Sequence, residues 1–586
     1  MRFGADVIEG GTRFRVWAPR PRQLELEVSG QRLTVPRDAL GWGEVVVPGV
    51  GPGARYCYVL DGDRRRPDPA SRSQPEGVHA PSEVVDPTRY RWQDTDTLQP
   101  PLTSLYELHV GTFSPAGTFD GVAERLADLQ DLGFDVLELM PVATWAGPRG
   151  WGYDGVTWLA PHAAYGGPER LRALVDACHQ RGMAVVLDVV FNHLGPEGNY
   201  LGEYGPYFTD RHTGWGEALD LDGSAAGPVR AFILHAARAL AAEFHLDGLR
   251  LDAVHALVDR SPQHLVAELS AALHADGEER GRPVWVIAES DLGTPRVVEP
   301  AEEGGWGCDA LWHDDFHDAL QAALTGEQTR RYADFGRVSQ VARTLERGFC
   351  QTGRRSIYRG RRYGEPAAHL DGRRIVVYAQ NHDQVGNRTF GERLSTLVPG
   401  CAHAVAVALL TSPFLPLVFM GEEYGEVAPF PFFTSFGDAV LGRAVRAARR
   451  REYGAGAPDP QDPATLEMAR LRPANAGARG EGLRRLYRTL LGLRRTRPSL
   501  AAQPLARTEA IAEGQAVVVR RASVREETLA VYKLGPEATQ LLLPIPRHGE
   551  WRMIVDAGDF GGPQGAQLEG ERLSLPGYGA IVCAAP

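Results

Sequence analysis

The alternation of apolar and polar positions first predicts a β-rich region at the start of the chain. Over the first 90 or so residues, short alternating segments are separated by Gly, Pro and Asp, a pattern typical of strands with one buried face. The clearest segments are Thr12–Ala18, Gln23–Val28, Trp42–Val47 and Tyr56–Leu60. Strands at this spacing predict a β-sandwich. The stretch Pro67–Pro101 is rich in proline and has no period, so we expect an ordered connector there.

From about Leu102 the pattern changes to short apolar runs that alternate with amphipathic stretches such as Val122–Leu132, Glu169–Gln180 and Val229–Glu243. Eight such runs predict a closed parallel (β/α)8 barrel. The runs are Tyr106–Val110, Val136–Leu139, Val185–Val189, Gly248–Leu251, Val284–Ala288, Ala310–Trp312, Ile375–Ala379 and Leu417–Met420. The long gaps after the third and sixth runs predict insertions in the connections that follow those two strands. A doubly wound sheet is the alternative, although it would more usually carry a glycine-rich phosphate loop after its first strand, which Gly111-Thr-Phe-Ser-Pro115 is not.

The last part of the chain again reads as β. Leucines at three- and four-residue spacing, from Leu483 to Leu493, predict a final helix that ends near Arg495-Thr-Arg-Pro-Ser. Four further strands are expected at Ala516–Arg520, Thr528–Lys533, Gln540–Leu543 and Gly579–Val582. The predicted fold class is therefore α/β: an immunoglobulin-like β-sandwich over 1–95, a (β/α)8 TIM barrel over 96–498 and a C-terminal β-sandwich over 499–586.

Composition narrows the class of protein. Apolar residues make up 43% of the chain and charged residues 23%, which is typical of a soluble globular protein. A net charge of −11 argues against nucleic acid or an anionic membrane as partner. The beginning, Met1–Asp6, lacks the apolar run of a secretory signal, and no stretch is long enough to span a bilayer. Six cysteines without CxxC pairs favour reduced thiols and a cytoplasmic location.

Polar side chains follow four of the eight predicted barrel strands, at the end where barrel enzymes collect their chemistry. The four segments are Leu187–His193, Arg250–Asp252, Trp285–Ser290 and Tyr378–Gln384. Each brings a carboxylate, and two bring a histidine. A single aspartate at a strand end is more often a helix cap or turn residue. Four in one barrel favour a catalytic site.

These segments resemble, in order, the four signature regions of the α-amylase superfamily of glycoside hydrolases. Phe14-Arg-Val-Trp-Ala-Pro19 also resembles the module that precedes the barrel in branching and debranching members, so the resemblance covers roughly residues 1–586. It implies retaining cleavage of α-glucosidic bonds. By position, it implies that Asp252 is the nucleophile, Glu289 the general acid/base and Asp383 the transition-state stabiliser.

The chemistry of these side chains agrees with that assignment. A retaining glycosidase needs two carboxyl groups about 5–5.5 Å apart, one ionised and one protonated. Arg250 leaves the same face of its strand as Asp252 and favours the anion. Glu289 follows an apolar run, where desolvation should raise its pKa. Asp383, flanked by His382, suits hydrogen bonds to ring hydroxyls that strengthen in the transition state.

Further residues are expected to bind the sugar at the cleavage subsite. The resemblance implies that His193 and His382 contact it, that Asp188 braces Arg250, and that Tyr153 in Trp151-Gly-Tyr-Asp-Gly155 stacks on a sugar ring. The plainer alternatives are structural histidines with satisfied hydrogen bonds and a tyrosine that packs in the core.

Other segments distinguish among superfamily members. Endo-acting amylases usually carry Lys-His three and four residues after the nucleophile, where this chain has His255 and Ala256. Branching enzymes usually have two successive acidic residues at the general acid, unlike Ala288–Arg296. Gln380–Arg388, Phe419–Glu426, Pro431–Phe433, Tyr207–Asp210 and Gly214–Glu217 most resemble maltooligosyltrehalose trehalohydrolases. This implies hydrolysis of the α-1,4 bond beside a terminal trehalose unit, and a functional pairing with a maltooligosyltrehalose synthase.

Selectivity for such a substrate requires leaving-group subsites shaped for an α,α-1,1-linked disaccharide. Loop residues just beyond the catalytic ones are the candidates, with Trp215 as a further stacking platform. They are His255, His313, Asp314, Gln384, Asn387 and Arg388. The alternative for each is ordinary loop structure.

No metal and no cofactor are expected. Some superfamily members bind calcium near the region around Asn192, but the sequence offers no convincing set of oxygen ligands there. Three other functions stay open: a glycogen branching enzyme that transfers the glucan to a sugar hydroxyl, another α-glucan hydrolase of the superfamily, and a catalytically inactive glucan-binding protein.

Overall fold

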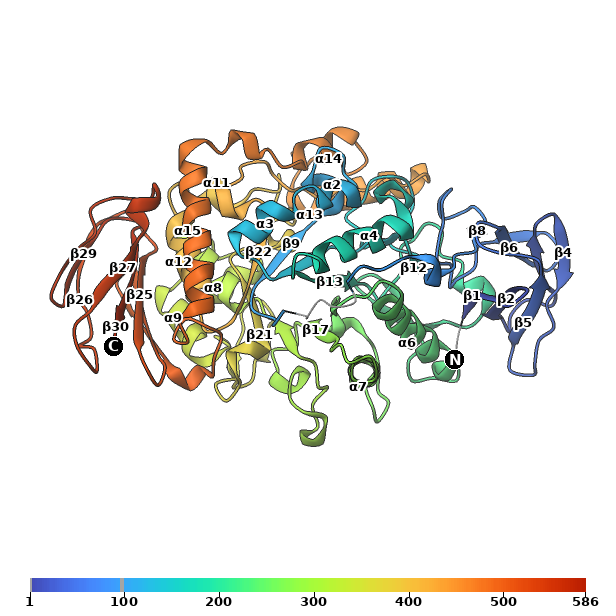
Figure 1. The fold of residues 1–586 in the computed structure, drawn as a ribbon, viewed down its shortest axis with the longest axis horizontal. Helices are drawn as coiled ribbons and strands as arrows, with labels where there is room; N and C mark the ends of the chain where they lie inside the picture. Colours follow the sequence, from blue (N-terminus) through green and yellow to red (C-terminus); the bar gives the residue numbers. More distant parts are fainter. Residues whose placement is uncertain (1–2, 95–99) are drawn as a thin grey trace.

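The structure, a computed structural model, describes residues 3–94 and 100–586. Residues 1–2 and the predicted boundary between 95 and 96 lie outside the described residues. Figure 1 shows an elongated molecule in which a central barrel with its helices separates two β-rich ends, the first blue and the second red. The arrangement places the N-terminal sheets and the C-terminal sheets at opposite ends of the long axis.

Eight parallel strands close into a barrel, which confirms the predicted fold class. In chain order they are β9 (Leu105–Leu108), β10 (Val136–Leu139), β13 (Ala184–Val189), β16 (Gly248–Leu251), β17 (Trp285–Glu289), β18 (Ala310–Trp312), β21 (Ile375–Tyr378) and β22 (Leu415–Phe419). Every strand pairs with the next in sequence, and β22 pairs with β9 to close the ring. The runs are buried at nearly every position because helices cover the outside and side chains fill the inside.

Helices follow the strands around the outside. They include α4 (Gly167–His179), α6 (Ala226–Glu243), α7 (Leu265–Arg280), α8 (Asp315–Thr325), α12 (Ala402–Leu410) and α15 (Gly477–Thr496). The predicted helix Val122–Leu132 is two helices, α2 (Phe119–Ala123) and α3 (Leu126–Leu132). The chain turns between them at Arg125, whose guanidinium bonds the Phe113 carbonyl at 2.7 Å and lies over the Phe113 ring.

The connections that follow β13 and β18 are longer than the other connections between barrel strands and contain further helices and strands. The first includes the hairpin of β14 (Phe208–Thr213) and β15 (Gly216–Leu219). The second includes α9 (Val338–Arg347) and the hairpin of β19 (Arg354–Arg355) and β20 (Arg362–Tyr363). Because both leave from the carboxyl ends of strands, they rise on the face where the catalytic candidates lie.

The N-terminal region forms two small sheets. One contains β1 (Gly4–Ile8), β2 (Gly11–Trp17) and β5 (Trp42–Pro48), and the other β4 (Gln31–Thr34), β3 (Leu24–Val28), β6 (Arg55–Leu60) and β7 (Arg64–Arg66), with β8 (Ser82–Glu83) paired to β6. The sandwich packs on the barrel through Trp17, whose ring meets Tyr207 at 5.0 Å, and through the ion pair of Arg72 with Glu243 at 2.7 Å.

The C-terminal region is also a two-sheet structure. One sheet has the order β23 (Thr508–Glu513), β24 (Ala516–Ala522), β25 (Glu527–Lys533), β30 (Ala580–Ala585) and β27 (Arg552–Asp556). The other contains β26 (Thr539–Leu542), β29 (Arg572–Leu575) and β28 (Gln567–Glu569). Arg521 of β24 joins this unit to the barrel because its buried guanidinium bonds the carbonyls of Thr411, Ser412 and Leu500 at 2.9–3.0 Å.

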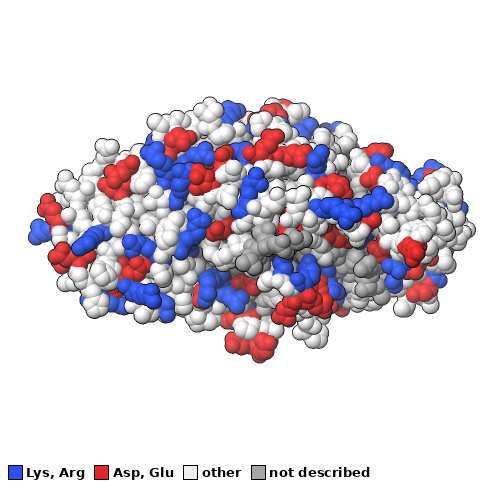
Figure 2. All heavy atoms as spheres, in the orientation of Figure 1, with Lys and Arg blue, Asp and Glu red and all other residues white. Residues whose placement is uncertain are grey.

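The molecular surface carries mixed charge. Figure 2 shows Lys and Arg side chains interspersed with Asp and Glu over the visible face. All six cysteines are buried and free. Within residues 3–94 and 100–586, no helix combines the length and the apolar character that a membrane crossing requires.

Candidate active site

One buried arginine holds the predicted catalytic residues together. Arg250 on β16 donates through Nη1 to both oxygens of Asp188 at 2.8 and 2.7 Å and to Asp252 Oδ1 at 2.8 Å. Its Nη2 lies 2.9 Å from Glu289 Oε2. The guanidinium also lies over the Trp312 ring, 4.4 Å from its centroid. A planar guanidinium fixes three carboxylates from three adjacent strands, so their relative positions depend on one side chain.

Asp252 stands at the carboxyl end of β16 with its second oxygen bound from the other side. Asn192 donates to Asp252 Oδ2 at 2.9 Å. The next residue, Ala253, adopts a left-handed conformation with φ of 39°, which is unusual for a residue with a Cβ and is typical of functional sites. This turn directs the Ala253 amide toward Glu289 Oε2 at 2.9 Å. The backbone after Asp252 therefore helps to position Glu289.

Glu289 has the electrostatics of a carboxylic acid that holds a proton near neutral pH. Burial raises its pKa to about 8, although the charge of Arg250 opposes that shift. Its side chain still has 22% of its surface exposed to the cleft. A carboxyl group in this state can donate a proton to a leaving oxygen and then act as a base.

Asp383 is placed by a buried dyad beneath it. Glu107 on β9 accepts from His382 Nδ1 at 2.5 Å, and both side chains are 1% exposed. Burial opposes protonation of His382, but the charges of Glu107 and Asp383 outweigh burial and raise its pKa to about 9. His382 Nε2 lies 3.5 Å from Asp383 Oδ1. An imidazolium thus stands next to the exposed carboxylate of Asp383.

A second buried glutamate in the barrel behaves differently. Burial and the nearby charge of Glu107 raise the pKa of Glu138 on β10 well above its ordinary value, despite Arg250. Neither carboxyl oxygen of Glu138 has a hydrogen-bond partner among the described residues. Burial therefore favours the neutral form of Glu138 inside the barrel, whereas Glu107 pairs with His382.

A cleft of about 510 Å³ opens above these groups. The predicted site residues that line it are Tyr153, His193, Trp215, Asp252, His255, Glu289, Asp314, Asp383 and Asn387. Tyr153 donates to Asp188 at 2.6 Å and lies against the His382 ring. Trp215 is 51% exposed and its ring is stacked on His193. The hairpin β14–β15 therefore brings Trp215 to the wall of the cleft.

Other predicted residues lie below or beside the cleft. Asp188, Arg250 and His382 form its buried base. Gln384 is buried and its amide donates to Asp314 at 2.9 Å. His313 is buried against Phe349, and Arg388 pairs with Glu327 at 3.1 Å, so neither lines the cleft. Their predicted contact with a ligand stays a prediction.

Several cleft residues were not identified from the sequence. Arg331 pairs with Asp314 and Asp318, at 2.5 and 2.9 Å. Although burial raises the pKa of Asp314, the charge of Arg331 and a hydrogen bond from Tyr378 outweigh it and hold the pKa at about 2. Arg331 follows no barrel strand directly, because it comes from the long connection after β18. Only the density of arginine in that connection could have drawn attention to it.

The hairpin β19–β20 supplies the other unrecognised wall. Arg359 forms a two-pronged ion pair with Asp291 and lies over the Tyr363 ring, 3.9 Å from its centroid. Tyr358 beside it is 52% exposed. His255 accepts a hydrogen bond from the Asp291 amide at 3.1 Å, so the hairpin reaches the predicted leaving-group residues through Asp291.

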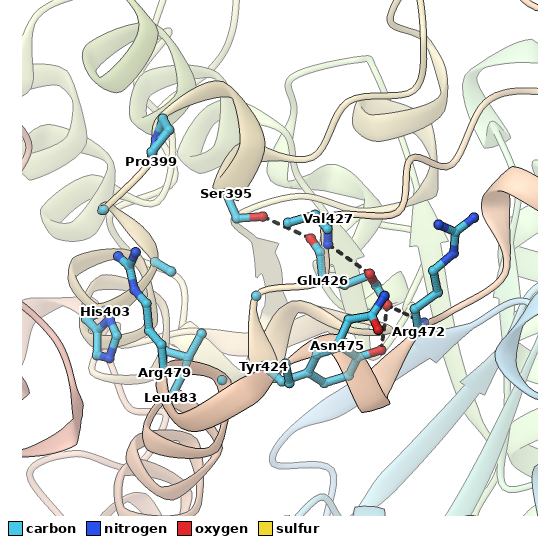
Figure 3. A pocket seen from close by; sticks show the side chains of 15 residues that line it. Ser395, Pro399, His403, Tyr424, Glu426, Val427, Arg472, Asn475, Arg479 and Leu483 are labelled. Atoms are coloured by element: carbon cyan, nitrogen blue, oxygen red, sulfur yellow. Dashed lines mark hydrogen bonds between the residues drawn. The ribbon is translucent and has the colours of Figure 1, made fainter.

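A smaller cavity of about 220 Å³ lies away from these carboxylates, between α12, α15 and the segment after β22. Figure 3 shows Arg479 and Arg472 at its two sides with Glu426 between them. The Glu426 carboxylate accepts from Tyr424 Oη and from three backbone amides, including that of Arg472.

Within the described part of the chain, no group of three or more His, Cys, Asp or Glu side chains is arranged to hold a metal ion.

An eight-stranded parallel barrel that gathers three carboxylates around one buried arginine at its carboxyl end defines a glycosidase of the α-amylase type. The match to the family "Alpha amylase, catalytic domain" covers residues 74–215. The chain belongs to the malto-oligosyltrehalose trehalohydrolase family, because relatives of that name are 39–44% identical to it over 80–98% of this chain.

The malto-oligosyltrehalose trehalohydrolase of Saccharolobus solfataricus is 44% identical over 80% of this chain and 83% of its own. That of Brevibacterium helvolum is 39% identical over 98% of both chains. Among solved structures, a putative α-amylase from Salmonella typhimurium has a TM-score of 0.91 with 35% identity, covering 100% of this chain and 99% of the other. A pullulanase from Bacillus acidopullulyticus, at 18% identity and a TM-score of 0.74, covers 100% of this chain and 75% of its own and shares the fold.

Proposed function

We propose that this enzyme hydrolyses the α-1,4 bond next to the terminal trehalose of maltooligosyltrehalose and releases free trehalose. Relatives that span most of the chain carry that name. The observation that carries the proposal for the chemistry is the Arg250 bridge, because it holds Asp252 and Glu289 on one guanidinium at 2.8 and 2.9 Å. Two carboxyl groups that share one guanidinium lie close to each other, as a retaining glycosidase requires.

In the first step, Asp252 attacks the anomeric carbon of the glucose at the scissile bond. The carbon–oxygen bond to trehalose breaks, and Glu289 gives its proton to the departing oxygen. A covalent β-glucosyl ester on Asp252 results, and Glu289 is left ionised. Asp383 stabilises the cationic sugar during the transfer by hydrogen bonds to its hydroxyls.

In the second step, ionised Glu289 removes a proton from water, and the water oxygen attacks the same carbon. The ester bond to Asp252 breaks, which restores the Asp252 carboxylate and the protonated Glu289. Two inversions leave the new reducing end in the α configuration. The raised pKa of Glu289 supports its role, since the same group must be an acid in one step and a base in the next.

The leaving trehalose is proposed to lie on the side of the cleft formed by His255, Asp314 and Trp215. His255 is fixed by the Asp291 amide, and Asp314 is held ionised by Arg331. An ionised carboxylate and a fixed imidazole can bond the hydroxyls of a compact disaccharide.

Product analysis with maltotriosyltrehalose tests the proposal. Free trehalose as the smallest product supports it, whereas new α-1,6 branches on amylose would identify a branching transferase. NMR of the first turnover should show the new glucan end as the α anomer. The β anomer as first product would exclude the retaining route.

We also propose a cytoplasmic location and a partnership with a maltooligosyltrehalose synthase. Six buried free thiols suit a reducing compartment. A substrate with a terminal trehalose unit must be made by an enzyme that converts the reducing end of a glucan into a 1,1-linkage.

A further inference from the structure

A second, larger groove lies beside the active cleft and has a different chemistry. Its volume is about 770 Å³, within the range of roughly 300–1,000 Å³ typical of small-molecule sites. It runs between α9, the hairpin β19–β20 and strand β23 of the C-terminal unit. Three residues line both spaces: Asp334, Phe335 and Gln351.

Arginine dominates this groove. Residues 337–362 contain eight arginines and one acidic residue, Glu346, in a chain whose net charge is −11. The arginines that line the groove are Arg337, Arg343, Arg347, Arg354 and Arg355. Among residues 3–94 and 100–586, none of these five guanidinium groups has an acidic side chain within ion-pair distance. The groove therefore gathers positive charge that no acidic side chain of the described residues pairs with.

The two carboxylates in the groove are already engaged. Asp334 accepts from the Ser356 hydroxyl and from the Ile357 amide. Glu346 accepts from the Ala510 amide at 3.2 Å and so ties α9 to β23. Both acids serve to position the walls of the groove, and the arginines remain available to a ligand.

Burial and apolar side chains distinguish this site from a solvated basic surface. Arg343 Nε is buried and has no hydrogen-bond partner among the described residues, while its Nη2 donates to Thr352. Ile357 is 75% exposed and Ile511 is 49% exposed, and the two come from different elements that line the groove. Exposed isoleucines beside arginines can cover the organic part of a ligand whose anionic part the guanidinium groups bind.

We propose that this arginine groove, defined by Arg337, Arg343, Arg347, Arg354 and Arg355, is a binding site for a phosphate ester. A phosphate offers three oxygens in the geometry that guanidinium groups bind in pairs, and the ester supplies an organic body for the isoleucines. Two sources share this chemistry: a free sugar phosphate, or a phosphate group carried on a glucan chain. The site goes beyond the proposed hydrolysis, and its test needs no turnover.

Calorimetric titration of the full-length protein with tripolyphosphate, glucose 6-phosphate and a phosphorylated maltooligosaccharide tests the site. One-to-one binding is expected, and the triple variant Arg347→Ser, Arg354→Ser, Arg355→Ser should weaken it about 10–150-fold, since each of the three charged contacts contributes roughly 0.5–1 kcal/mol at an exposed position. A matched control replaces Arg443, Arg485 and Arg525, which are exposed arginines outside the groove, and should change Kd by less than about 2-fold.

The preferred source follows from which ester binds more tightly, with the unphosphorylated maltooligosaccharide as the neutral comparison. If the triple variant does not fold, phenylglyoxal labelling of the unmutated protein replaces it: tripolyphosphate should protect Arg354 and Arg355 and leave Arg485 reactive. Absence of saturable binding, equal weakening in both triple variants, or unprotected groove arginines would overturn the site.

Discussion

The active cleft and the arginine groove are adjacent, but their arginines differ: the cleft arginine is paired with carboxylates, and the groove arginines are not. In the cleft, Arg250 is fully buried and contacts three carboxylates. In the groove, Arg347, Arg354 and Arg355 are exposed and have no acidic partner among the described residues. In the cleft, Arg250 fixes the relative positions of the three carboxylates, because a guanidinium that is bound to all three cannot change its conformation. The groove keeps its arginines free to bind an external anion.

The comparison holds within the barrel as well. Glu107 and Glu138 lie on adjacent strands at paired positions, yet Glu107 pairs with His382, whereas burial favours the neutral form of Glu138. The two differ in that Glu107 has a partner of opposite charge at hydrogen-bonding distance, and Glu138 has no hydrogen-bond partner among the described residues. The predictions that follow, from the largest expected effect to the smallest, test this contrast between paired and unpaired charges.

Replacing the proposed nucleophile should have the largest effect. In Asp252→Asn the covalent route disappears, so kcat should fall at least about 10⁴-fold with the fold retained. Circular dichroism checks the fold. Azide added to Asp252→Gly should restore turnover and give a β-glucosyl azide. Activity near that of the unchanged enzyme would rule out this nucleophile.

Glu289→Gln should lower kcat/KM by about 10²–10⁴-fold on the natural substrate, because the leaving oxygen receives no proton. A substrate with a good leaving group, such as an aryl glucoside, needs no such proton. For this substrate the rate of the glycosylation step should fall far less. The unchanged enzyme should lose kcat/KM above pH about 8, and the variant should lack that limb. If the variant also loses kcat/KM above pH about 8, the loss of activity at high pH comes from the titration of a group other than Glu289.

The shift of Glu289 also predicts the pH dependence of stability. Its folded pKa of about 8 exceeds the ordinary value of 4.5. Between these values the folded state holds a proton that the unfolded chain releases, so the free energy of unfolding should fall as pH rises through that range. Glu289→Gln should show a smaller decline in chemical denaturation at pH 5, 7 and 9.

The paired and neutral glutamates give a matched test. Glu107→Gln removes the anion beside His382 and should lower kcat/KM about 10–100-fold, since His382 loses its charge and its fixed orientation. Glu138→Gln replaces a neutral acid with a neutral amide and should change kcat/KM less than about 3-fold. NMR titration should show a lower pKa of His382 in the first variant alone. Equal effects of the two substitutions would contradict the distinction.

Selectivity should depend on the leaving-group side. His255→Ala and Asp314→Ala should reduce kcat/KM about 10-fold more for maltooligosyltrehalose than for a plain maltooligosaccharide of equal length, because each removes a contact of ~1.4 kcal/mol or more to the trehalose unit. Steady-state kinetics on both substrates measure this ratio. Equal losses on the two substrates would remove these residues from trehalose recognition.

The smallest effect is expected in the groove. Arg347→Ser, Arg354→Ser and Arg355→Ser should leave kcat without added anion within about 2-fold and raise stability at low salt by up to ~1 kcal/mol, because like charges no longer repel one another. Thermal unfolding at two salt concentrations measures the gain, which should vanish at high salt. A loss of stability would mean that these arginines have partners of their own.

Much of the barrel could be predicted because its strands are buried on both faces. Runs such as Val136–Leu139 and Gly248–Leu251 match the structure at both ends. The first run ends earlier, at Leu108, because the chain turns into α1 (Val110–Phe113). Short exposed strands such as β4 and β7 were not predicted, since pairing with a neighbour and not hydrophobic pattern makes them strands.

The site residues likewise fall into those that could be predicted from the sequence and those that could not. Asp252, Glu289 and Asp383 could be found because each lies at or beyond the carboxyl end of a buried strand, and strand ends of a barrel meet on one face. Glu107 and Glu138 look from the sequence like ordinary polar positions in strands. Their roles depend on what lies across the barrel, and Glu107 is 275 residues from His382 in the chain.

The sequence by itself determined the barrel, the candidate catalytic carboxylates and the order in which they appear, because buried strands and their ends have a characteristic local choice of residue types. Only the tertiary structure decided which charges are paired: Arg250 with three carboxylates, Arg331 with Asp314, and the groove arginines with no acidic side chain of the described residues. Pairing is a matter of distance between segments far apart in the chain, and a sequence does not contain those distances.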